Sequence, residues 1–104
     1  MNAQDLMLGD WIFYGKTPVR VLQLSEGKVY KGFHPIPLTA KILEKNLANE
    51  QRNGYISWVK DEYCETCFDI EMLINSTIIE KRFEYVHQLQ HALRLCGIDK
   101  DIEI

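Results

Sequence analysis

The sequence predicts an α+β fold in which a curved antiparallel sheet of five or six strands packs with two helices, in a single domain spanning residues 1–104. Apolar and acidic residues alternate from Phe68 to Met72, which is typical of a half-buried strand. Apolar residues recur at helical spacing from Tyr85 to Cys96. Before these segments, short strand-like runs alternate with glycine, proline and asparagine turns, which favours an antiparallel sheet.

The N-terminal part predicts a meander of the small-barrel kind. A mostly aromatic run at residues 11–14 and a stretch at 19–24 that is rich in strand-forming residues flank a Gly-Lys-Thr-Pro turn, which predicts a hairpin. A second turn leads to a third strand at residues 29–33. The two prolines of residues 34–37 predict a rigid extended connector in place of a further strand.

Thr39 is predicted to cap the first helix, which is expected over residues 40–48 or 40–49. Leu38 and Leu43 stand at the spacing of a hydrophobic staple. Beyond Asn53-Gly54, strands are expected at residues 55–60, 68–72 and 77–83, the last two joined by a turn at Asn75-Ser76. The residues expected on the buried faces of these elements are Ile42, Leu43, Leu47, Ile56, Trp58, Phe68, Ile70 and Met72.

The second helix is expected from Tyr85 to Cys96, with Leu89 and Leu93 at the centre of its buried stripe. Gly97 is expected to adopt the left-handed conformation that ends a helix and returns the next residue onto it in a Schellman motif. Residues 101–104 can add a short closing strand.

The composition favours a cytoplasmic protein without a membrane partner. No apolar run reaches the length that crosses a bilayer, and the first residues show no export signal. The odd count of three cysteines favours reduced thiols over a disulfide framework. The net charge of −3 gives no overall attraction to nucleic acid.

Three segments, spread over most of the chain, resemble a family of small proteins of Bacteroides-type genomes, prophages and phages. They are Asp5-Leu6 with Leu8-Gly9-Asp10-Trp11, then Pro35-Ile36-Pro37-Leu38-Thr39, then Tyr85-Val86-His87-Gln88-Leu89-Gln90. The resemblance implies a mobile-element protein and brings no particular activity with it. His34 and His91 depart from the pattern of the family, which has an acid and an amide-type residue there. Cys64 and Cys67 lie outside that pattern.

Cys64, Cys67, His87 and His91 follow the order and pair spacings of a Cys₂His₂ zinc site. The segment between the pairs is longer than the ~12 residues of a zinc finger. It also reads as two strands that can fold without metal, so the expected cofactor is none. A redox role for the Cys-x-x-Cys pair has less support, because its acidic flanks raise a thiol pKa.

The sequence predicts a protein that is not an enzyme, because it shows neither a nucleophile elbow nor a glycine-rich phosphate loop. Nucleic-acid binding is an alternative function. The N-terminal segment combines aromatic residues with basic ones, which suits base stacking beside phosphate contacts. The basic residues of this alternative are Lys16, Arg20, Lys28 and Lys31.

The first hypothesis is an accessory or protein-binding module, encoded by a mobile element and acting on a host complex. Its interaction surface is expected on the side of the second helix that faces away from the buried stripe, at His87, Gln88, His91, Arg94 and Leu95. The ordinary outer face of a helix is the alternative explanation for these residues. We also expect residues 35–37 to cross the second helix, with Ile36 buried and Gln88 or Gln90 bonded to the connector backbone.

Overall fold

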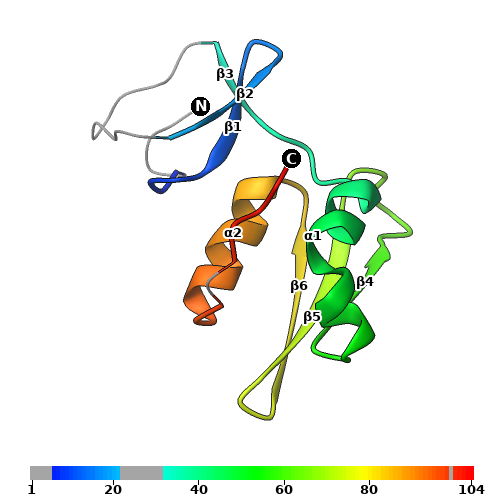
Figure 1. The fold of residues 1–104 in the computed structure, drawn as a ribbon. Coiled ribbons are helices and arrows are strands. Elements are labelled where there is room, and N and C mark those ends of the chain that lie inside the picture. Colours follow the sequence, from blue (N-terminus) through cyan, green and yellow to red (C-terminus); the bar gives the residue numbers. More distant parts are fainter. Residues whose placement is uncertain (1–5, 22–31, 99) are drawn as a thin grey trace.

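The computed structural model describes residues 6–21, 32–98 and 100–104 of the chain. It is an α+β structure with two helices, as predicted, but its strands form two separate three-stranded antiparallel sheets (Figure 1). The elements in chain order are β1 Trp11–Tyr14, β2 Thr17–Arg20, β3 Phe33–Pro35, α1 Ala40–Arg52, β4 Ile56–Lys60, β5 Phe68–Ile74, β6 Thr77–Phe83 and α2 Val86–Leu95.

The expectation of one curved sheet of five or six strands is wrong, and neither sheet closes into a barrel. The chain leaves the first sheet after β3 and bonds to the segment that precedes α2. Leu38 N donates to Glu84 O, and Val86 N donates to Ile36 O, both at 2.9 Å. Because these groups are used there, and the prolines on either side of Ile36 have no donor, residues 36–38 cannot continue one sheet into the other.

The first sheet has the strand order β2-β1-β3, so its third strand pairs with β1 and the expected meander order is wrong. The predicted third strand at residues 29–33 lies mostly outside the described residues. Strand β3 includes Pro35, which pairs with Ile12, so the first half of the predicted connector is a strand. β3 is an edge strand, where the missing proline donor leaves no inner ladder bond unmade.

Helices α1 and α2 cover one face of the β4-β5-β6 sheet, with α1 beside β4 and α2 beside β6 (Figure 1). The predicted alternation in β5 is confirmed, because Phe68, Ile70 and Met72 are buried between sheet and helices. The main core also contains Ile36, Leu38, Leu43, Leu47, Ile56, Phe83, Val86, Leu89, Leu93 and Ile102. A smaller core of Leu6, Ile12 and Val21 lies in the N-terminal part.

Helix α1 begins at the predicted position, since Ile42 N donates to the side-chain oxygen of Thr39 at 3.2 Å. It continues three residues beyond the predicted end at Asn49, because no helix breaker precedes Gly54, whose φ is +78°. The turn between β5 and β6 is confirmed at Asn75 and Ser76. Both residues have positive φ, as two-residue hairpin turns require.

Helix α2 ends in the predicted Schellman motif. Gly97 has a φ of +73°, its N–H donates to Arg94 O at 3.0 Å, and Ile98 N donates to Leu93 O at 2.9 Å. Residues 101–104 do not form the expected strand. They are held by side chains instead: Trp11 Nε1 donates to Ile102 O at 2.6 Å, and Asn46 bonds to the backbone of Glu103.

Residues 35–37 contact the start of α2, as predicted, because Ile36 is buried and its carbonyl oxygen accepts from Val86 N. The predicted role of the glutamines is wrong. Gln88 accepts from Glu84 N and Tyr85 N at the start of its own helix, and Gln90 bonds to Gly9 and Trp11. Backbone groups bridge the connector and α2, so the amide side chains are free for other bonds.

Candidate functional site

The predicted interaction surface on α2 is only partly exposed. His87 is 6% exposed, so its expected outward orientation is wrong; its ring stacks on that of Tyr85 with 5.8 Å between centroids. The side chains of His91 and Arg94 turn toward the N-terminal segment, where they meet Asp10. Leu95, by contrast, is 84% exposed. The N-terminal segment therefore covers part of the face of α2 that the sequence pattern predicted to be exposed to solvent.

Asp10 is fully buried at the junction between the first sheet and α2. Its Oδ2 atom accepts from Met7 N at 2.7 Å and lies 2.6 Å from His91 Nε2. Its Oδ1 atom lies 3.2 Å from Arg94 Nη1. A buried carboxylate is tolerated when it is bonded and paired in this way. Asp10 therefore fixes the side chains of His91 and Arg94 in one arrangement.

Gln90 joins the same junction one turn before Arg94. Trp11 N donates to Gln90 Oε1 at 2.9 Å, and Gln90 Nε2 donates to Gly9 O at 3.3 Å. Sequence reasoning missed Asp10 as a contact residue, and it predicted a backbone bond for Gln88 or Gln90 but to the connector and not to Gly9 and Trp11. One signal was present: Gln90 follows Leu89, the centre of the buried stripe, and a polar side chain near a buried stripe needs a hydrogen-bond partner.

A shallow groove of about 220 Å³ runs between β6 and α2, on the side of α2 away from the Gly9 and Gln90 contacts. Three of the predicted surface residues, Gln88, His91 and Leu95, contribute to its wall. Strand β6 contributes Lys81, Arg82 and Phe83. Arg82 forms ion pairs with Asp61 at 2.8 Å and with Asp69 at 3.8 Å, so Lys81 supplies the positive charge on the strand side of the groove, and Leu95 is the exposed leucine on the helix side.

The basic residues of the nucleic-acid alternative do not all lie in the described part of the chain. Lys28 and Lys31 lie outside the described residues. Lys16 is exposed at the β1–β2 turn, whereas Arg20 stacks over the Trp11 ring at 4.4 Å and bonds Asp101 at 2.6 Å. Arg20 is thus engaged with protein groups, and no set of basic residues is seen together on this sheet within the described ranges.

Cys64 and Cys67 are joined in a disulfide, so the expectation of reduced thiols is wrong for this pair. Cys96 is a free thiol. The Asp61 N–H donates to Cys67 O at 3.0 Å, and Cys67 N–H donates to Cys64 O, which brings the two cysteines together in a tight turn. In residues 6–21, 32–98 and 100–104, no three His, Cys, Asp or Glu side chains lie close enough together to hold a metal ion. The four residues of the zinc alternative are therefore not brought together.

In the part of the chain that the structure describes, the pKa values of Glu50 and Tyr85 are shifted. Burial raises the pKa of Glu50, but bonds from Lys100 Nζ at 2.5 Å and from its own backbone outweigh burial and hold the pKa below its ordinary value. Burial, and secondarily the neighbouring Glu84 carboxylate, raises the pKa of Tyr85 above 10.0. Glu50 and Lys100 thus tie α1 to the C-terminal segment as an ion pair.

Comparison with protein-family models, with curated proteins and with solved structures finds no match to this chain. Neither α1 nor α2 is long and apolar enough to cross a bilayer, and the same holds for the whole described part of the chain.

Proposed function

We propose that the protein is an accessory, protein-binding module that holds an extended segment of a partner protein in the groove between β6 and α2. One observation carries this proposal: within the described ranges, β6 pairs with β5 alone, and α2 lies along its other side (Figure 1). A strand edge beside a helix is a common way to hold a peptide, because the peptide can add a strand to the sheet and place alternate side chains against the helix.

The groove also indicates the chemistry of the segment. Lys81 lies on the same sheet face as Phe83, toward α2, and has no ion-pair partner among the residues that the structure describes. An acidic side chain of the partner would pair with it. Leu95 is exposed at the end of the groove and suits an apolar side chain. We therefore expect an extended segment that carries an acidic and an apolar residue on the face turned toward α2.

The resemblance to prophage and phage proteins adds the hypothesis that the bound segment belongs to a host complex. The nucleic-acid alternative has less support, because within the described ranges no set of basic residues is seen together on the first sheet. The zinc alternative has less support as well, since Cys64 is bonded to Cys67.

Selection of binding peptides from a random library, followed by affinity measurement, tests the proposed function. We expect selected peptides that combine acidic and apolar residues, and amide signals of β6 and α2 that shift when they bind. Lys81→Glu and Leu95→Ser should each weaken binding by roughly ten-fold.

The other edge strand of the same sheet provides matched controls. Val59 is 65% exposed on β4, and Lys60 follows it on the same strand. Val59→Ser and Lys60→Glu therefore make the same chemical changes on β4 and should leave the affinity unchanged. Selected peptides that bind equally well to Lys81→Glu and Leu95→Ser, or a library that yields no binder, would count against the groove.

A further inference from the structure

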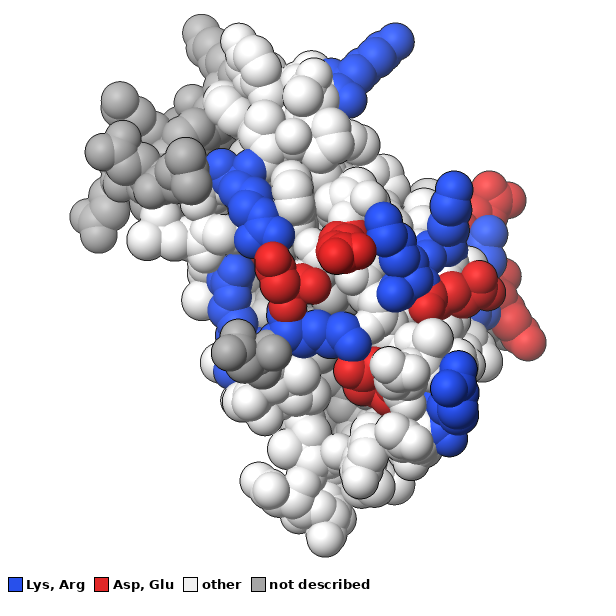
Figure 2. All heavy atoms as spheres, in the orientation of Figure 1, with Lys and Arg blue, Asp and Glu red and all other residues white. Residues whose placement is uncertain are grey.

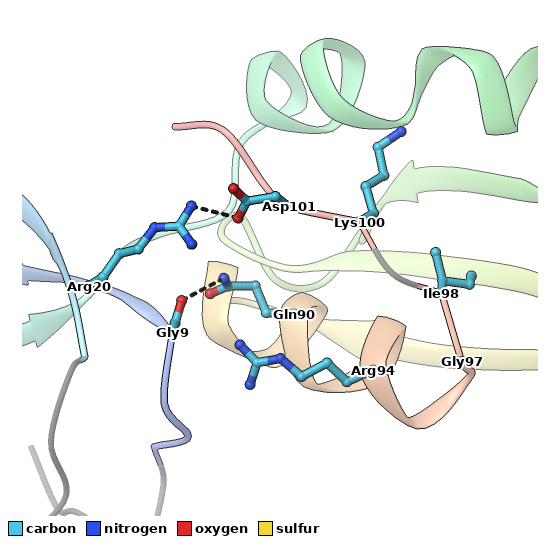
Figure 3. A pocket seen from close by; sticks show the side chains of 8 residues that line it. All are labelled: Gly9, Arg20, Gln90, Arg94, Gly97, Ile98, Lys100 and Asp101. Atoms are coloured by element: carbon cyan, nitrogen blue, oxygen red, sulfur yellow. Dashed lines mark hydrogen bonds and ion pairs between the residues drawn. The ribbon is translucent and has the colours of Figure 1, made fainter.

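A second pocket, of about 430 Å³, lies where β2, α2 and the C-terminal segment meet (Figure 3). It is lined by Gly9, Arg20, Gln90, Arg94, Ile98 and Asp101, among others. Its volume falls in the range of small-molecule sites, about 300–1,000 Å³. The groove between β6 and α2 uses none of these residues, so the two sites are separate.

Two arginines enter this pocket from different elements. Arg20 projects from β2 with its guanidinium turned to Asp101, whereas Arg94 projects from α2 with its guanidinium near Gly9 and Gln90 (Figure 3). Lys100 contributes to the wall, but its ammonium group bonds Glu50. Lysine and arginine side chains stand among acidic ones on this face of the molecule (Figure 2).

Each guanidinium keeps donors for a ligand. Arg20 uses Nη2 to bond Asp101 Oδ1 at 2.6 Å, and Arg94 lies with Nη1 at 3.2 Å from Asp10 Oδ1. A guanidinium carries five N–H donors in a flat fork that fits carboxylate and phosphate oxygens. The carboxylate partners therefore position the two forks without saturating them.

Gly9 keeps the pocket open beside Arg94. Its φ of +85° disfavours any other residue, and a Cβ atom at this position would lie 3.4 Å from Arg94 Nη2. A side chain there would extend further toward the guanidinium and occupy the space between the two arginines. The glycine thus lets Arg94 lie directly over the backbone while its remaining donors stay accessible.

Asp101 shows the kind of group that the pocket accepts. Its carboxylate bonds Arg20, yet its side chain is 73% exposed and comes from a segment without regular secondary structure. An exposed carboxylate in such an ion pair contributes little stability, so a ligand oxyanion can replace it. The buried carboxylate of Asp10, in contrast, stays in place and holds Arg94.

We propose that this pocket binds a small organic oxyanion, a phosphate or carboxylate compound, between Arg20 and Arg94, and that the ligand displaces Asp101 from Arg20. The half-buried side chain of Ile98 lines the same pocket and offers an apolar contact for the organic part. Two guanidinium groups in one pocket favour a ligand with two negative charges over one with a single charge.

Titration of the isotope-labelled protein with inorganic phosphate and with citrate, at constant ionic strength, tests this site. The amide signals of Gly9, Gly97 and Ile98 should shift in a saturable way. Acetate should bind more weakly than citrate, and sodium chloride should produce no such shifts. A larger response to phosphate than to citrate would identify a phosphate compound, and the reverse a polycarboxylate.

Three substitutions give effects of opposite sign. Arg20→Gln and Arg94→Gln should each weaken binding by roughly ten-fold or more, whereas Asp101→Asn should tighten it, because the competing carboxylate is removed. Arg52→Gln, an equal charge change at an exposed site at the end of α1, is the control and should have no effect. Thermal unfolding without ligand shows whether each variant is folded.

Arg94→Gln also removes the contact between Arg94 and Asp10 and can therefore unfold the protein. In that case Arg20→Gln alone decides the test. Shifts that do not saturate, or that Arg20→Gln and Asp101→Asn leave unchanged, would overturn the proposal. Lys81→Glu and Leu95→Ser should bind the anion normally, so failure of the peptide groove and failure of this pocket can be told apart.

Discussion

Asp10 and His91 lie 2.6 Å apart across the junction between the first sheet and α2, and Asp10 is fully buried there. Arg94 approaches the other oxygen of the same carboxylate, while Met7 donates its backbone N–H to it. The junction is thus held by one buried acid that faces two side chains from consecutive turns of a helix. Removal of the acid would leave the partly buried Met7 N–H and the His91 and Arg94 side chains without their common partner, which is costly.

Asp10→Ala should therefore lower the free energy of unfolding by about 1–3 kcal/mol, because the groups that lose their acceptor are only partly buried. Urea denaturation at neutral pH measures the change. Asp69→Ala is the control, because Asp69 is far more exposed and lies 3.8 Å from Arg82. Its loss should cost less than about 1 kcal/mol. Equal effects of the two substitutions would show that the Asp10 pair adds no more than a surface contact.

The orientation of α2 can be tested with two leucines of the same helix. Leu89 is completely buried and Leu95 is 84% exposed. Leu89→Ala should destabilise the protein by about 2–5 kcal/mol, because it leaves a cavity in the core. Leu95→Ala should change stability by less than about 0.5 kcal/mol. A small effect at Leu89 would mean that the helix presents another face to the sheet.

Local patterns predicted the strands β4, β5 and β6 and the two helices well. The alternation in β5, the Thr39 cap and the Schellman motif at Gly97 each depend on residues close in sequence, so their physics can be read from short windows. The division into two sheets was not predictable in this way. It follows from backbone bonds of Ile36 and Leu38 to Val86 and Glu84, which are distant in the chain.

The candidate sites were predicted less completely for the same reason. Helical periodicity correctly placed Leu89 and Leu93 in the core, but it could not show that Asp10 approaches His91 from a separate segment. The cysteine count favoured free thiols, whereas the disulfide depends on the tight turn between Cys64 and Cys67. The Asp10–His91 contact joins distant segments, whereas the disulfide depends on the backbone conformation of one short turn.

The Glu50–Lys100 pair predicts a dependence of stability on pH. The pKa of Glu50 lies below its ordinary value in the folded protein, so the folded state binds its proton less readily than the unfolded state. The stabilisation is fully present above the unfolded pKa and is lost as pH falls through the folded pKa. Glu50→Gln should therefore destabilise the protein at pH ~7 more than at pH ~3.

Urea denaturation of both proteins across this pH range measures the difference. Glu44→Gln, at an exposed position of the same helix, is the control and should show no such convergence. A gap between wild type and Glu50→Gln that stays constant as the pH falls would contradict the assignment of the pair.

The last prediction concerns Asn46, whose side chain bonds the backbone of the C-terminal segment as a neighbouring strand would. Its Oδ1 accepts from Glu103 N and its Nδ2 donates to Glu103 O, both at 2.7 Å, so one side chain satisfies both backbone groups. Ile102 precedes Glu103 and is completely buried, and its carbonyl oxygen accepts from Trp11 Nε1 at 2.6 Å. Asn46→Ala should cost about 1–3 kcal/mol, because two partly buried bonds to the backbone of Glu103 are lost together.

The same substitution should release the C-terminal segment as a unit. We expect faster amide hydrogen exchange at residues 102–104 and a shifted indole N–H signal of Trp11, with the exchange of β5 changed only through global stability. Asn49→Ala, at an exposed position one turn further along α1, is the matched control and should leave the indole signal in place. If Asn46→Ala destabilised the protein while the Trp11 signal and the exchange at residues 102–104 stayed as in wild type, the side chain would act within α1 alone, through its bond to Ile42 O.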